Sequence, residues 1–238
     1  MPGWAQPTPD PGRQPAPCLH CPHTAFPATR SRPVARPAPT SKHTKNRSLS
    51  LDAAGWLHPH PTVQHAPSPN HDNRPGRAVV SLLVLHDISL PPGEFGGDHV
   101  VQFFQNTLDF NSHPWFDNIR TLRVSAHFFI RRTGAIVQCV ATTQRAWHAG
   151  VSRFRQRERC NDFSVGIELE GTDTLPYTSA QYRALRHLVH ALRRRHPIRA
   201  VQGHEHIAPT RKTDPGPAFD WPRFQRENGW KPWQMPAT

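Results

Sequence analysis

A short segment rich in proline and glycine carries two histidines, a lysine and an aspartate between residues 203 and 216. It lacks the periodic apolar positions of a helix or a half-buried strand, and its two prolines break strand pairing, so we expect a loop that leaves a strand end. Imidazole and carboxylate groups close together on a loop are what a zinc ion needs from one side. The segment is therefore a candidate metal site, with Asp214 and either His204 or His206 as ligands.

A third ligand must come from elsewhere in the chain, and His86 is the best candidate. It follows the apolar run of residues 79–85, whose length and composition predict a buried strand that ends at His86. Two histidines and one aspartate fill three positions of a tetrahedral zinc ion and leave the fourth for water, which is the catalytic pattern. On the residues alone a purely structural role for His86 stays open, because a lone histidine at a strand end is more often structural.

Hydrolysis at such a site also needs a proton acceptor and a donor for the developing oxyanion. Residues 163–171 predict another strand, whose alternation puts Glu168 on the face opposite the apolar side chains. A carboxylate there is suited to shuttle the proton of an attacking water, and the Lys212 ammonium is suited to stabilise negative charge. The pattern indicates hydrolysis of an amide or ester. The alternative is that Glu168 lies on an exposed sheet face and that Lys212 only keeps its loop soluble.

The elements that must position these residues alternate between strands and helices. Helical patterns are expected from Asp98 to about Leu108, over 179–196 and after Asp220, and a hairpin is expected over 125–140. Three further segments are expected to be loops or irregular: 52–78, 111–121 and 141–162. This order favours a single α/β domain with a central mixed sheet flanked by helices.

The first 51 residues differ in composition from the rest. Eleven of the 27 prolines lie in residues 1–40, and residues 1–50 carry seven Lys and Arg against one Asp. This predicts a disordered basic arm over 1–51, a domain over 52–230 and a tail over 231–238. Cys18 and Cys21 with two nearby histidines form only half of a zinc motif. A start codon other than Met near residue 51 is an alternative explanation of the arm.

The remaining composition bears on the compartment and the partners. The four cysteines suggest no disulfide framework, no apolar run marks a secretory signal, and no stretch approaches about 20 apolar residues. These features favour a cytoplasmic protein without a membrane span. The net charge of +12 allows contact with anionic polymers, but half of it lies on the arm, so it says little about the ligand of the domain.

Three separated motifs carry a family resemblance. Residues 84–97, 160–173 and 203–221 resemble the AmpD-type N-acetylmuramoyl-L-alanine amidases, and the likeness extends over about residues 52–230. It implies the amidase and peptidoglycan-recognition fold. It also implies a cytoplasmic, zinc-dependent enzyme of peptidoglycan recycling that cuts the amide between 1,6-anhydro-N-acetylmuramic acid and L-alanine. An anhydromuropeptide is then the expected partner, and we expect one zinc ion per chain and a monomer.

The resemblance also implies a role for individual residues. The family's zinc ligands match His86, His204 and Asp214, which favours His204 over His206; the proton shuttle matches Glu168 and the oxyanion-stabilising lysine matches Lys212. Two arginines fall where relatives contact the carboxylates of the peptide, namely Arg123 and Arg159. Two positions depart from the family, because it usually has Asn where this chain has Asp87 and Trp where it has Phe154. An extra carboxylate at residue 87 is expected to affect substrate binding or the pKa of the zinc-bound water.

Two other classes of protein remain as alternatives. Peptidoglycan recognition modules resemble this fold, and some bind muropeptides without cleaving them; the presence of all three ligands, Glu168 and Lys212 favours an enzyme. A nucleic-acid binder that uses the basic arm would show salt-sensitive retention on DNA that is lost when residues 1–51 are removed. We expect no specific nucleic-acid partner.

Overall fold

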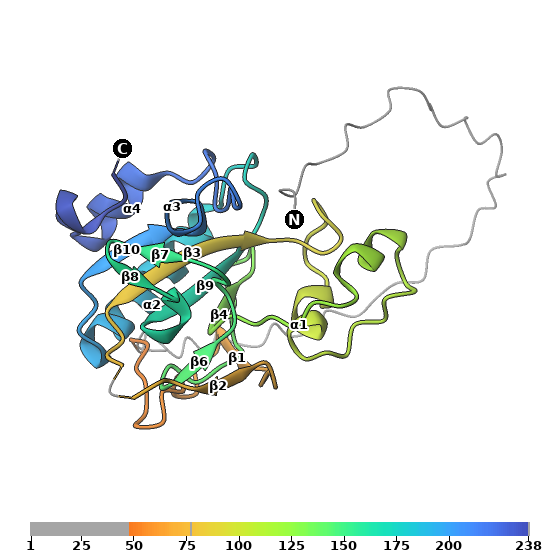
Figure 1. Cartoon of the computed structure of the whole chain (residues 1–238), viewed down its shortest axis with the longest axis horizontal. Coiled ribbons are helices and arrows are strands. Elements are labelled where there is room, and N and C mark those ends of the chain that lie inside the picture. Colours follow the sequence, from red (N-terminus) through yellow and green to blue (C-terminus); the bar gives the residue numbers. More distant parts are fainter. Residues whose placement is uncertain (1–47, 77, 238) are drawn as a thin grey trace, which may run out of the picture. The chain divides into compact units, whose positions relative to one another are not determined.

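Six strands form the central sheet of the computed structural model, which describes residues 48–76 and 78–237 (Figure 1). Across the sheet the order is β1-β5-β4-β9-β3-β10. The strands span Val63–His65 (β1), Ile136–Gln138 (β5), Phe128–Ile130 (β4), Ser164–Glu170 (β9), Leu82–Ile88 (β3) and Ala200–Gly203 (β10). The predicted arm, except residues 48–51, and the half motif at Cys18 and Cys21 lie outside the described residues.

The pairing directions make this a mixed sheet. β4 and β5 run antiparallel as the predicted hairpin, while β4-β9, β9-β3, β3-β10 and β1-β5 are parallel. The predicted α/β class with a mixed central sheet is therefore confirmed. The central strands β3 and β9 are covered on both sides, which explains why the sequence of β3 is almost continuously apolar.

The main hydrophobic core lies between one face of the sheet and two helices, α2 (Ser179–Arg195) and α4 (Trp221–Asn228). A capping box starts α2: Gln181 N donates to Thr178 Oγ1 at 3.1 Å, and Thr178 N donates to Gln181 Oε1 at 3.0 Å. The predicted apolar stripe of α2 is buried, and the helix ends just before Pro197, as expected from the sequence. The basic residues of α2 lie mostly outside this stripe.

Loops and short elements cover the other face of the sheet. One apolar cluster packs under α1 (His99–Phe104), and a smaller one joins Leu82 and Val84 of β3 to Ala149 and Ile207. No helix among the described residues is long and apolar enough to cross a membrane. This second face is the one that carries the polar side chains of β3 and β9.

Several sequence-based boundaries were wrong. β3 begins at Leu82 rather than residue 79 and continues to Ile88, so His86 lies inside the strand and not at its end. The first helix is shorter than expected, because the chain leaves it after Phe104 and Asn106 adopts φ 60°. The segment that starts at residue 203 is not all loop, since His204–Ile207 form one helical turn, α3.

The segments expected to be irregular also contain short elements. β2 (His71–Asn73) pairs antiparallel with β6 (Gln144–Ala146), and β7 (Arg153–Phe154) pairs with β8 (Arg157–Glu158). Two 3-10 helices also lie in these segments, η1 (Pro114–Ile119) and η2 (Cys160–Asp162), and a third, η3 (Pro232–Gln234), lies in the predicted tail. Strands of two or three residues lack a detectable period, because period-2 alternation needs at least four positions to be read.

Candidate active site

One row of side chains crosses three parallel strands on the sheet face opposite α2. β9 and β3 pair so that Glu168 lies opposite His86. β10 and β3 pair with Gly203 opposite Leu85, so the next residue, His204, continues this row where α3 begins. Because side chains alternate between the two faces of a strand, His86 points away from the core that contains Leu85.

Asp214 reaches the row from the loop after α3. Glu205 N donates to the carbonyl oxygen of Asp214 at 2.9 Å, which ties the loop to the start of the helix. Asp214 Oδ2 lies 3.0 Å from His86 Nδ1 and 3.0 Å from His204 Nδ1, and the two Nδ1 atoms are 3.0 Å apart. The three predicted ligands are thus together, in a group that can hold a metal ion.

The hydrogen bonds behind the two imidazoles fit a metal site. His204 Nε2 lies 3.1 Å from the carbonyl oxygen of Ala149, so this nitrogen carries the hydrogen and the Nδ1 of the neutral ring has a lone pair. His86 Nε2 in turn lies 3.0 Å from His148 Nδ1. Ligand atoms around a tetrahedral zinc ion are about 3.3 Å apart for bond lengths of 2.0–2.1 Å. The three facing atoms therefore fit zinc in both type and spacing.

The protonation states of His86 and Asp214 also suit a cation. Burial lowers the pKa of His86 to about 4, so this ring is neutral at pH 7. Burial by itself would raise the pKa of Asp214, but its hydrogen bonds with His204 and His86 outweigh burial and lower that pKa. Neutral imidazoles and an ionised carboxylate are the forms in which these side chains bind metals.

Glu168 is buried beside the three ligands and does not join them. Its Oε1 lies 4.0 Å from His86 Nδ1, and its buried Oε2 has no hydrogen-bond partner among the described residues. Burial raises the pKa of Glu168 well above its usual range; the charges of Asp214 and Asp87 raise it further, and that of Lys212 opposes them. A carboxylate with a raised pKa and an unsatisfied oxygen is chemically suited to accept a proton.

Lys212 and Asp87 flank the group. The half-buried Lys212 lies close enough for its charge to act on both His86 and Glu168. The Tyr177 hydroxyl lies 3.2 Å from Asp87 Oδ2. Burial, then the charges of Asp214 and other nearby acids, raises the pKa of Asp87 to about 8.

Three other candidates have different surroundings. His206 Nδ1 accepts a hydrogen bond from Gly203 N at 3.0 Å, which directs this ring away from the three ligands. Arg123 is exposed, and its Nη1 donates to nearby backbone carbonyls. Arg159 is also exposed, and its Nε lies 3.3 Å from Asp162 Oδ2. The contacts of both arginines are thus local.

Sequence reasoning missed one residue that the structure brings to the site. His148 lies in the segment expected to be a loop between residues 141 and 162, and its ring contacts His86. With 17 histidines in the chain, nothing in the sequence singled out this one. Phe154, where the resemblance led us to expect Trp, is partly buried against the small cluster that includes Leu82 and Val84 of β3.

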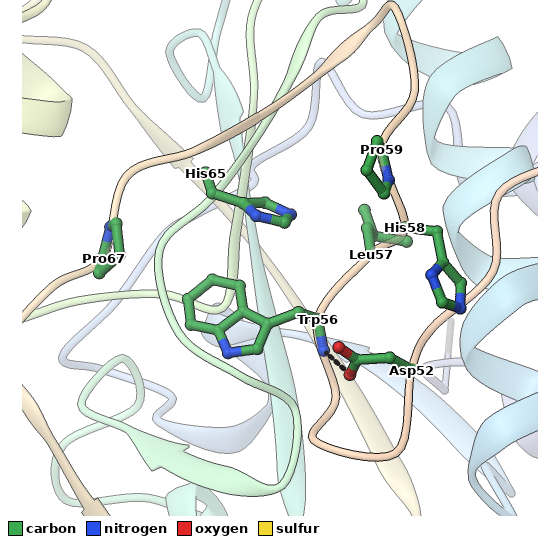
Figure 2. Close-up of a pocket in the computed structure, with 7 residues that line it drawn as sticks. All are labelled: Asp52, Trp56, Leu57, His58, Pro59, His65 and Pro67. Carbon is green, nitrogen blue, oxygen red and sulfur yellow. Dashed lines mark hydrogen bonds between the residues drawn. The ribbon is translucent and has the colours of Figure 1, made fainter.

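A separate pocket lies in the segment between residues 52 and 67 (Figure 2). Its volume is about 320 Å³. Trp56 and His65 are among its lining residues, and the centroids of their rings are 5.1 Å apart. Trp56 N donates to Asp52 Oδ1 at 2.8 Å, which joins two of the lining residues. None of its lining residues belongs to the row of His86, so the pocket is not part of the candidate active site.

Comparison with known proteins identifies the family. Residues 75–217 match the model of the N-acetylmuramoyl-L-alanine amidase family, Amidase_2. The chain is 58% identical over 173 residues to 1,6-anhydro-N-acetylmuramyl-L-alanine amidase AmpD of Citrobacter freundii, covering 72% of this chain and 91% of that protein. It is 56% identical over 173 residues to the AmpD of Escherichia coli K12, covering 72% and 93%. The chain therefore belongs to the N-acetylmuramoyl-L-alanine amidase family.

A solved structure supports the same assignment. The crystal structure of a selenomethionine derivative of AmpD superimposes with a TM-score of 0.71 at 56% identity, covering 74% of this chain and 98% of that one. The family resemblance and the predicted enzyme class, an amidase and thus a hydrolase, are confirmed. The non-catalytic binding module is the less favoured alternative.

Proposed function

We propose that this protein is a zinc-dependent amidase that hydrolyses the amide between 1,6-anhydro-N-acetylmuramic acid and L-alanine during peptidoglycan recycling. The observation that carries the proposal is the convergence of His86 Nδ1, His204 Nδ1 and Asp214 Oδ2, 3.0 Å from one another, beside a buried carboxylate. The identity to relatives named as anhydromuramyl amidases supports the substrate class.

His86, His204 and Asp214 hold the zinc ion in this proposal. Zinc bound by two histidines and a carboxylate supplies Lewis acidity and a bound water with a pKa near 7. The alignment of Glu168 with His86 across β9 and β3 supports a role for Glu168 at the same place. Glu168 is not one of the three ligands, so its carboxylate is available for proton transfer. Its raised pKa favours holding a proton between the two steps of the reaction.

Glu168 takes the proton from the attacking water as the new carbon–oxygen bond forms at the lactyl carbonyl. Lys212 stabilises the negative charge that develops on the carbonyl oxygen, as an oxyanion donor does. Glu168 then gives its proton to the departing nitrogen as the carbon–nitrogen bond breaks, which releases the free amine of L-alanine. The immediate products are a carboxylic acid on the sugar and a peptide with a free amino terminus. The second hydrogen of the water stays on the new carboxyl group and then passes to the amine, which gives a carboxylate and an ammonium group, so atoms and charges balance.

The remaining assignments concern the substrate and the cell. Arg123 and Arg159 contact the carboxylates of the stem peptide, and their exposure leaves both guanidiniums accessible to an anionic ligand. The protein acts as a monomer in the cytoplasm on soluble muropeptide. Residues 52–230 are the catalytic domain in this proposal, preceded by the arm of residues 1–51 and followed by a tail of residues 231–238.

The deciding experiment incubates the full-length protein with a purified 1,6-anhydro-N-acetylmuramyl tripeptide and identifies the products by mass spectrometry. We expect the free tripeptide and anhydro-N-acetylmuramic acid, loss of turnover with a chelator, and recovery with added zinc. Zinc binding without cleavage would instead support the binding module. Equal cleavage with and without the chelator, in protein shown to be metal-free, would contradict zinc dependence.

A further inference from the structure

The far side of both histidine ligands is contacted by one short segment of the β6–β7 connection. His148 Nδ1 lies 3.0 Å from His86 Nε2, and the carbonyl oxygen of the next residue, Ala149, lies 3.1 Å from His204 Nε2. All these groups are buried, with His148 only 8% exposed. The proton-transfer steps described above do not use His148, so its burial against a ligand needs another explanation.

His148 is held in place from several directions. Its backbone N–H and that of Ala149 both donate to Asn161 Oδ1, at 3.2 and 2.8 Å. Its ring lies over Gly166 of β9, where an added Cβ would come within 2.4 Å of the ring. A side chain at residue 166 would therefore exclude the ring, and the glycine opens the space that His148 fills.

The hydrogen bonds of His148 determine which of its ring nitrogens carries the hydrogen. Ser164 Oγ donates to the carbonyl oxygen of Cys160 at 2.6 Å, which uses the only hydrogen of the hydroxyl. Ser164 Oγ must then accept from His148 Nε2, which is 3.1 Å away, so this nitrogen carries the hydrogen of the neutral ring. His148 Nδ1 is left with a lone pair and accepts from His86 Nε2.

The consequence for His86 is a defined tautomer. With its hydrogen on Nε2, the neutral His86 ring has its lone pair on Nδ1, the atom that faces Asp214 and His204. The opposite tautomer would put a hydrogen at Nδ1, where a metal must bind. Outer groups that orient a ligating histidine in this way typically change metal affinity by about 10–100-fold.

We propose that His148 is a positioning residue that, through its hydrogen bonds to His86 and Ser164, fixes His86 in the tautomer with a free Nδ1 and so strengthens zinc binding. The inference rests on the proposed zinc function. It assigns His148 no contact with the substrate, and it predicts that the side chain is needed for its acceptor atom rather than for its volume.

The test measures zinc affinity of the full-length protein by competition with a chromophoric chelator at pH 7.5, independently of turnover. His148→Leu replaces the ring by an apolar side chain of similar size that offers no acceptor, and we expect zinc affinity to fall by about 10–100-fold. His148→Asn places an amide oxygen near the position of Nδ1, and we expect it to restore most of the affinity. The absorption spectrum of the cobalt-substituted protein should change for the Leu variant and remain close to wild type for the Asn variant.

A matched control separates this role from general packing. His196 is also buried, and its Nε2 lies 2.9 Å from Thr142 Oγ1, away from the ligand group. His196→Leu should lower the melting temperature and leave zinc affinity unchanged. If His148→Leu does not fold, Ser164→Ala tests the same chain of bonds, because it removes the acceptor that fixes the His148 tautomer. We expect Ser164→Ala to lose zinc affinity as well, by less than His148→Leu, because Ser164 does not contact His86 directly.

The outcomes distinguish the inference from the proposed function. Wild type that binds one zinc ion, with equal affinity in a folded His148→Leu variant, would overturn the role of His148 and leave the proposed function standing. Equal losses in the Leu and Asn variants would show that packing, not the acceptor, is what matters, and unchanged affinity in Ser164→Ala would remove the tautomer argument. Wild type that binds no zinc would overturn both proposals.

Discussion

Replacement of Glu168 by glutamine separates proton transfer from metal binding. The substitution keeps the size of the side chain and removes its ability to take up a proton. Glu168 Oε2 is buried without a partner among the described residues, and Oε1 is 4.0 Å from His86 Nδ1, farther than the 3.0 Å that separates the three ligand atoms. We therefore expect Glu168→Gln to bind zinc like wild type and to lose turnover.

The size of the loss follows from the role assigned to this carboxylate. A positioned general base or acid contributes about 10²–10⁴-fold to the rate, which corresponds to about 3–5 kcal/mol of activation free energy. Glu168→Asp retains the carboxylate but draws it back by one methylene group. A misplacement of about 1 Å costs about 10²-fold, so the aspartate variant should fall between wild type and glutamine in kcat.

The assay combines kcat and KM on an anhydromuropeptide with zinc content measured on the same preparation. Glu170 provides a matched control, because it is a buried glutamate two residues along the same face of β9. Its carboxylate accepts hydrogen bonds from Gly96 N at 2.6 Å and Arg132 N at 2.8 Å, so it is a structural anchor. Glu170→Gln should lower the melting temperature and change kcat little in the folded protein.

Two results would refute this reasoning. A Glu168→Gln variant that retains near-normal kcat would show that another group shuttles the proton. A variant that loses zinc along with activity would show that Glu168 helps to bind the metal, and that the unpartnered oxygen serves coordination rather than catalysis.

Three further predictions rest on the same structure. Asp214→Ala removes one of three ligands, so zinc affinity measured by chelator competition should fall by more than the 10–100-fold typical of an outer-sphere partner, and wild-type affinity would refute the ligand assignment. Lys212→Ala should lower kcat by about 10²–10³-fold with a smaller effect on KM, and the reverse pattern would indicate a binding role. Burial, with the charges of two nearby arginines, lowers the pKa of His196 to about 4. His196 of the unfolded chain takes up a proton near pH 6.5. Its contribution to the free energy of unfolding should therefore be fully present above that pH and be lost as pH drops towards 4, by on the order of 1–2 kcal/mol allowing for screening. Urea unfolding of His196→Gln should show a shallower fall over this range, and an unchanged slope would contradict the assignment.

The long elements could be predicted from the sequence because each contains its own evidence. The apolar run before His86 and the alternation around Glu168 identify the two central strands, and the apolar stripe of α2 recurs along a helix of 17 residues. β1, β2 and β6 contain three residues each and exist only because a partner strand supplies their hydrogen bonds. No local pattern encodes such a partner, which explains why these segments were expected to be loops.

The sequence by itself predicted the kinds of zinc ligand and identified the family to which the chain belongs. From spacing alone it left His204 and His206 as competitors. The tertiary structure brings His204 to the ligand group, because the pairing of β10 with β3 continues into His204, whereas the His206 ring bonds back to Gly203. It also revealed His148, which lies 62 positions along the chain from His86. Strand register and loop packing join residues that are far apart in the sequence, and such contacts leave no trace in local composition or periodicity.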